Sequence, residues 1–147
     1  MLGTWRLRRR RYIVEEIESW ESGQTEVPKD VADEIVRLDA ALERVVIESL
    51  NCARHSPGTE SVLIRYENAK EVGRFDPQVA ERFGPVALQV HAALVMRLAQ
   101  GLKRMGRKVR IIYMDRRDYD DWRDRQRIDE SDAARIAWAS RAAAVTT

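Results

Sequence analysis

Two short segments rich in β-branched residues flank the longest apolar stretch of this 147-residue chain, and this pattern limits the possible folds most strongly. Residues 108–114 have the Val, Ile and Tyr content of a strand, and residues 61–67 include a Val-Leu-Ile run. Residues 85–105 between them predict a helix. A strand, a crossover helix and a second strand in one sheet predict two parallel strands joined by a right-handed connection.

The helix predicted over 85–105 is apolar on most of its surface. Gly84 and Pro85 mark its start, and Gly106 marks its end. Its polar residues occupy only a narrow strip, so we expect this helix to be the buried centre of the fold. One apolar face is formed by Val86, Val90, Leu94, Leu98 and Leu102.

Residues 61–72 also fit a helix, because Val62, Tyr66 and Ala69 have helical spacing and Gly73 follows as a stop signal. The β-branched content favours a strand over 61–67, and the helical alternative stays open. A two-stranded sheet is small, which invites pairing with a strand of a second copy.

Helical periodicity accounts for most of the remaining chain. Residues 4–21 predict one helix, Asp76 and Pro77 predict the start of a short one, and residues 115–130 predict a charged one. A last helix is expected from about Ser131, with fraying from Ala142 to Thr147. The cleanest amphipathic helix is expected over 28–49, with Val31, Ile35, Leu38, Leu42 and Val45 on one face.

Together these elements predict an α+β, mainly helical fold, with a long buried central helix and a minimal two-stranded sheet. The length fits a single domain over 1–147. We expect this domain to consist of a basic N-terminal helix over 1–22, a core over 28–114 and charged C-terminal helices over 115–147.

Charge is distributed unevenly along the first third of the chain, although the net charge is only +2. Residues 1–14 contain five arginines and no acid, whereas residues 15–48 contain eleven acids and three bases. Such a swing indicates an electrostatic partner, inside the molecule or outside it.

The arginine-rich start predicts a small non-catalytic regulatory protein that binds DNA, RNA or a complex that handles nucleic acid. Arginine pairs bidentately with phosphate, and Trp5 or Tyr12 would stack on bases. A second basic cluster at the end of the central helix would add the phosphate contacts that one short segment lacks. The predicted nucleic-acid-binding residues are Arg6, Arg8, Arg9, Arg10, Arg11, Lys103, Arg104, Arg107, Lys108 and Arg110.

The same charges support an alternative function. The acidic helix over 30–48 would neutralise Arg8–Arg11, either within one copy or across a homodimer. This helix and the mixed-charge segment 115–130 also predict a docking surface for another protein, where charge complementarity favours selectivity and association rate. The alternative is therefore a protein–protein interaction module or inhibitor.

Glu67 and Asp115 carry a third hypothesis, a Mg²⁺-dependent nuclease. Each residue follows a predicted strand, and the carboxyl ends of parallel strands lie at one edge of a sheet. Two carboxylates there, with Asp118 one helical turn further, would hold Mg²⁺. Asp115 is equally well placed to cap the helix that begins at Arg116, which needs no metal.

The remaining reactive side chains do not predict an active site. Cys52 and His55 supply two zinc ligands where about four are needed, and His91 borders the apolar face of the central helix. Walker A, GxGxxG, HExxH and GxSxG motifs are absent from the sequence. We therefore expect no enzyme activity, no cofactor and no bound metal.

Compartment and membrane signals point to the cytoplasm. The single cysteine excludes an intramolecular disulfide and fits a reducing compartment. Glu15 and Glu16 interrupt the apolar stretch that a signal peptide would need, and the apolar run over 85–96 is too short to span a bilayer. We expect no membrane partner.

Overall fold

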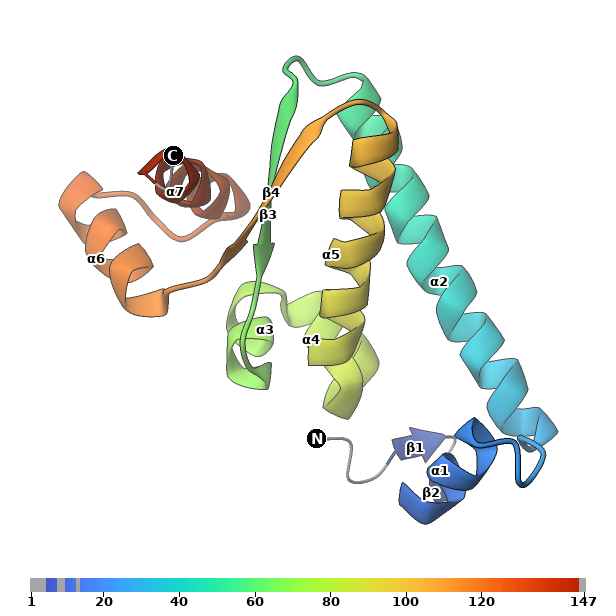
Figure 1. The fold of residues 1–147 in the computed structure, drawn as a ribbon. Helices are drawn as coiled ribbons and strands as arrows, with labels where there is room; N and C mark the ends of the chain where they lie inside the picture. The colour runs from blue at the N-terminus through green and yellow to red at the C-terminus, as the bar shows by residue number, and fades with distance from the viewer. Residues whose placement is uncertain (1–4, 8–9, 13, 146–147) are drawn as a thin grey trace. The chain divides into compact units, whose positions relative to one another are not determined.

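The computed structural model describes residues 5–7, 10–12 and 14–145 (Figure 1). The chain divides into two compact units, Met1–Val45 and Val46–Thr147, and the division falls within one long helix, α2 (Lys29–Arg54). The single domain expected over 1–147 stays a prediction, since compactness does not test whether the units fold independently.

The first unit begins with a hairpin where a helix was predicted. Strands β1 (Trp5–Leu7) and β2 (Arg10–Tyr12) pair antiparallel, and helix α1 extends only from Val14 to Glu21. The helix predicted over 4–21 is therefore wrong for the described residues before Val14. No aliphatic residue stands between Leu7 and Ile13, so this stretch has no apolar helical face, and its Trp and Tyr favour strands.

Helix α2 confirms the predicted amphipathic helix and continues to Arg54. At its start, Val31 is buried against the partly buried Ile17 and Trp20 of α1. Further along the predicted apolar face, Leu42 is buried, whereas Ile35 is exposed. The face predicted as core is thus only partly used as core.

The second unit contains the predicted parallel pair. Strand β3 (Glu60–Arg65) pairs with β4 (Lys108–Tyr113), and the register runs from Glu60 opposite Lys108 to Arg65 opposite Tyr113. Helix α5 (Ala87–Arg104) lies between the two strands in sequence. It is the predicted buried helix, with buried side chains at Ala87, Val90, His91, Leu94, Val95, Ala99 and Leu102.

Helices cover both faces of this sheet. Helix α5 packs against β3 and β4 on one side, and α7 (Asp132–Val145) packs against both strands on the other (Figure 1). Helix α6 (Arg116–Gln126) follows β4 directly and contacts α7. The α+β, mainly helical fold with a long buried helix and a two-stranded parallel sheet is therefore confirmed.

Two short helices and a 3₁₀ turn connect β3 to α5. They are α3 (Ala69–Phe75), α4 (Pro77–Phe83) and η1 (Gly84–Val86). Asp76 caps α4 and Pro77 is its first residue, as predicted. Helix α3 was not predicted, and the ambiguous segment 61–72 is a strand followed by this helix.

The main core includes the two C-terminal helices. Trp138 of α7 and Tyr119 of α6 are the largest fully buried side chains. The Tyr119 ring makes edge contacts with Phe75 and Trp138, with 5.7 Å between ring centroids in both pairs. The fraying predicted from Ala142 is wrong as far as Val145, because Ala143 is buried and holds the last turn of α7 in place.

Within the described part of the chain, no helix combines the length and the apolar character needed to cross a membrane.

Candidate functional site

The basic cluster predicted at the end of α5 separates into two kinds of residue. Lys103 and Arg104, in the last turn of α5, and Lys108, at the start of β4, are exposed. Arg107 and Arg110 are only partly exposed and bond to the protein itself. The first three residues are accessible to a partner, whereas the last two hold the fold together.

Arg107 ties the end of α2 to the start of β4. Its guanidinium donates hydrogen bonds to the backbone carbonyl oxygens of Ala53 and Ser56, the latter at 2.8 Å. The last carbonyls of a helix have no partner within the helix. The Ala53 carbonyl accepts the backbone N–H of Ser56 at 3.1 Å, and Arg107 adds a second, charged donor to it.

Arg110 bridges β4, β3 and α7. Its Nε lies 2.8 Å from a carboxylate oxygen of Glu60, and its Nη1 donates to the carbonyl oxygen of Ala143 at 2.6 Å. Both predicted phosphate contacts, at Arg107 and Arg110, are thus already engaged inside the second unit.

The arginines of the N-terminal hairpin are described only by their backbone. The register places Arg6 opposite Arg11 and Leu7 opposite Arg10, with Trp5 opposite Tyr12 at the open end. Arg8 and Arg9 lie outside the described residues. Among the described residues, two antiparallel strands therefore stand where the helix was predicted.

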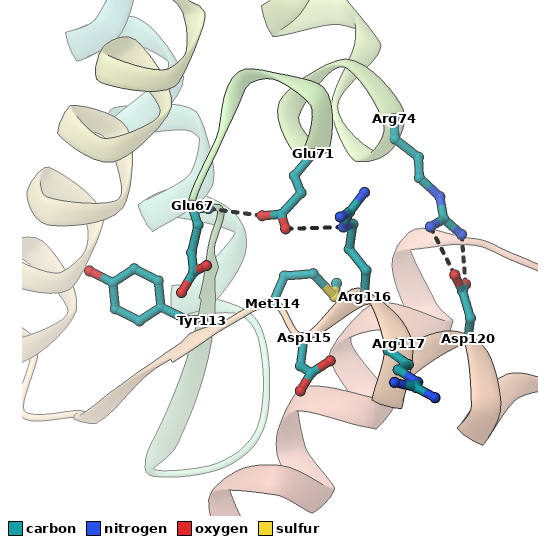
Figure 2. A pocket seen from close by; sticks show the side chains of 9 residues that line it. All are labelled: Glu67, Glu71, Arg74, Tyr113, Met114, Asp115, Arg116, Arg117 and Asp120. Atoms are coloured by element: carbon teal, nitrogen blue, oxygen red, sulfur yellow. Dashed lines mark hydrogen bonds and ion pairs between the residues drawn. The ribbon is translucent and has the colours of Figure 1, made fainter. Parts of the chain in front are cut away.

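The carboxyl ends of β3 and β4 border an open depression of about 620 Å³ (Figure 2). Glu67 and Asp115 both line it, as predicted from their positions after the two strands. Helices α3 and α6 and the end of β4 supply most of the remaining side chains. The full lining is Glu67, Glu71, Arg74, Tyr113, Met114, Asp115, Arg116, Arg117 and Asp120.

Asp115 and Asp118 both have structural partners. The Asp115 side chain accepts the backbone N–H of Asp118 at 3.0 Å and is the N-cap of α6. Asp118 accepts hydrogen bonds from the Trp138 indole at 2.7 Å and from Arg141 at 2.9 Å, and it does not line the depression. Among the described residues, no cluster of three acidic, histidine or cysteine side chains has the arrangement of a metal site.

Glu71 is the buried acid of the depression, with only 4% of its surface exposed. Its carboxylate accepts the backbone N–H of Glu67 at 2.8 Å and lies 3.4 Å from Nε of Arg116. The Glu71 backbone N–H in turn donates to the Asn68 side chain at 3.0 Å. The spacing of Asn68 and Glu71 matches a capping box, a sequence signal that would have revealed both α3 and this acid.

Arg74 of α3 and Asp120 of α6 form a bidentate pair across the depression (Figure 2), with N···O distances of 2.9 and 2.6 Å. Arg123 also donates to Asp120, at 3.0 Å. The hydrogen bond from Arg74 is the main cause that lowers the pKa of the Asp120 carboxyl below its ordinary value. No local pattern joins residues so far apart in sequence, so only the fold reveals this pair.

The histidines and the cysteine do not assemble a reactive group in the structure. Cys52 and His55 are both exposed. His91 is buried in α5 with its ring 4.6 Å from the Tyr66 ring, and burial lowers the pKa of the imidazole. His91 is therefore a neutral core residue at physiological pH, as its position on the apolar face suggested.

The depression has limited chemical capacity. Its arginines and acids mostly neutralise one another, and its best-placed carboxylate for a ligand is the exposed Glu67. No protein-family model matches the chain, and no curated protein is significantly similar to it in sequence.

Proposed function

We propose that this protein is a non-catalytic, cytoplasmic regulator that binds nucleic acid through the β1–β2 hairpin, with Lys103, Arg104 and Lys108 as an additional basic surface. The observation that carries the proposal is the register of the two described strands, which sets Arg6 opposite Arg11, together with the arginine run Arg8–Arg11 in the sequence.

Like charges directly opposite in an antiparallel pair destabilise it. A hairpin with this register gains stability when a polyanion neutralises its arginines, and phosphate groups pair well with guanidinium. A two-stranded ribbon also fits the major groove of B-DNA, and Trp5 and Tyr12, opposite one another in the register, are of the aromatic type that stacks on exposed bases. Duplex and single-stranded ligands are therefore both worth testing.

Arg107 and Arg110 leave the set of proposed contacts, because the fold already uses their donors. They supply a control instead. Removing Arg110 should lower the free energy of unfolding with little effect on the affinity for nucleic acid. Removing the arginines at positions 8–11 should lower that affinity with little effect on the free energy of unfolding.

The test is titration of a labelled duplex and of its single strand, at two salt concentrations, with the parent protein and with Arg8–Arg11→Ala. We expect the parent to bind at low salt, and the variant to lose roughly 3 to 4 units of the slope of log K against log salt. Arg110→Ala is the control and should keep the parent slope. Absence of binding by the parent at low salt would refute the proposal, as would an unchanged slope in the hairpin variant.

A second candidate function is docking to another protein through α2. This 26-residue helix exposes large apolar side chains among its acids, including Val36 at 66% and Ile47 at 50%. Val36→Ser with Ile47→Ser should abolish stoichiometric co-purification of a partner, whereas Ile136→Ser, an equally exposed apolar residue on α7, should not. Retention of the partner by the double variant would exclude α2 as the docking helix.

A further inference from the structure

Strand β4 is an edge strand, because β3 is its sole partner among the described strands. The backbone N–H groups of Lys108 and Met114 donate to the carbonyl oxygens of Thr59 and Arg65, both on the β3 side. In a parallel ladder these bonds recur at every second residue, so the even-numbered residues of β4 bond to β3. Val109, Ile111 and Tyr113 therefore direct their backbone N–H and C=O groups away from the sheet.

The same edge exposes apolar side chains. Ile111 keeps 37% of its surface exposed and Tyr113 keeps 49%. An open edge with exposed apolar residues is a template for another strand. A two-stranded sheet also has fewer strands than most sheets in globular proteins. The edge has neither a proline nor an inward-pointing charge at these positions to block pairing.

We propose that a second copy of this chain occupies the edge, with the two β4 strands antiparallel and a twofold axis at Ile111. This register places Ile111 opposite Ile111 of the other copy and Val109 opposite Tyr113. Aliphatic and aromatic residues in such cross-strand positions stabilise a pair. The sheet then continues across both copies.

Charge and strand length select this register over its neighbours. Centring the axis on Arg110 would set two arginines opposite one another. Centring it on Ile112 would pair only residues 111–113, because β4 ends at Tyr113, whereas the axis at Ile111 pairs residues 109–113. With the axis at Ile111, the basic start of β4 meets the end of the other β4, where Asp115 is exposed. The strand is thus complementary to itself in one antiparallel register.

The register is tested by cross-linking in a Cys52→Ser background, since Cys52 is exposed and would react on its own. Residues opposite in a hydrogen-bonded antiparallel pair have Cα atoms about 5.5 Å apart, a separation that a disulfide spans. Mild oxidation of Ile111→Cys should therefore give a covalent dimer. Ile136→Cys, an exposed position on α7, should stay monomeric on a non-reducing gel.

The affinity is tested by sedimentation equilibrium from micromolar to near-millimolar protein. The parent should dimerise, and Ile111→Lys should raise the dissociation constant at least about tenfold, because it removes the apolar pair and sets two like charges opposite. Circular dichroism checks that Ile111→Lys is folded; if it is not, the cysteine cross-link alone decides. A monomeric parent would overturn the proposal, and so would a dimer that neither cross-links at Ile111→Cys nor weakens in Ile111→Lys.

Discussion

The two ends of the β3–β4 pair use arginine in different ways. At the amino end, Arg107 donates to backbone carbonyls at the end of α2 and in the following loop. At the carboxyl end, Arg74 and Arg116 pair with the side chains of Asp120 and Glu71. The backbone partner of Arg107 cannot be changed by mutation, whereas the carboxyl-end pairs depend on side chains that can vary.

This comparison shows why counting arginines does not locate a binding surface. The basic cluster at the end of α5 was predicted to bind phosphate, but two of its members, Arg107 and Arg110, donate hydrogen bonds to backbone carbonyls of the protein itself. The carbonyl end of a helix attracts cations, so an arginine beside it can be bound by the fold and not by an external anion. The role of an arginine is therefore decided by which acceptor lies nearest.

The largest effect is expected at the amino end. Arg107→Ala leaves the carbonyls of Ala53 and Ser56 without this donor, and hydrogen bonds from charged groups are strong, so we expect a loss of about 3 kcal/mol in the free energy of unfolding. Urea denaturation measures it. Lys108→Ala, the exposed neighbour, is the control and should change stability little. A loss no larger than that of the control would show that the amino end is not held by Arg107.

The next effect is expected at the buried acid of the carboxyl end. Glu71→Ala removes the acceptor of the Glu67 N–H and the partner of Arg116, which should cost about 2 kcal/mol. Glu71→Gln keeps an acceptor oxygen and should recover about half of this loss. Equal urea midpoints for the two variants would contradict a hydrogen-bonding role.

A smaller effect is expected for the exposed pair at the same end. A double-mutant cycle with Arg74→Ala and Asp120→Ala should give a coupling of about 0.5 kcal/mol that decreases in high salt, because both side chains are partly exposed. The pKa of Asp120 is lowered in the fold, so its contribution is present above the ordinary value of 3.8 and is lost as pH falls further. A coupling that salt leaves unchanged would contradict a solvent-screened pair.

The smallest effect at neutral pH is expected for His91, whose ring lies tilted against Tyr66 just beyond the end of β3. Burial lowers the pKa of the His91 imidazole in the folded protein. As pH drops below the ordinary value of 6.5, the imidazole is protonated in the unfolded chain before it is protonated in the folded protein, so the free energy of unfolding decreases. His91→Leu should flatten the dependence of the free energy of unfolding on pH between 6.5 and the lower pKa of the folded state. The same slope in parent and variant would assign the dependence to another group.

Local signals accounted for much of the fold. The β-branched runs, the apolar helix between them and the Asp76-Pro77 start all appear where the pattern placed them. The antiparallel pair was missed because the predicted helix extended the helical spacing of Ile13, Ile17 and Trp20 toward the start of the chain, where no aliphatic residue stands between Leu7 and Ile13. Glu67 and Asp115 line one depression as predicted, and Asp115 caps α6, the role that the sequence also indicated.

The sequence by itself indicated the strand over 108–114, the buried helix before it and the unequal distribution of charge, since these depend on residues near one another in the chain. It left a helical alternative open for residues 61–72, which the structure resolved as β3 followed by α3. Only the tertiary structure decided that Arg107 and Arg110 belong to the fold, that Arg74 meets Asp120, and that β4 has an open edge. Apolar periodicity is a local property of the chain. The partner of a charged side chain depends instead on which distant segment the packed core brings within hydrogen-bonding distance.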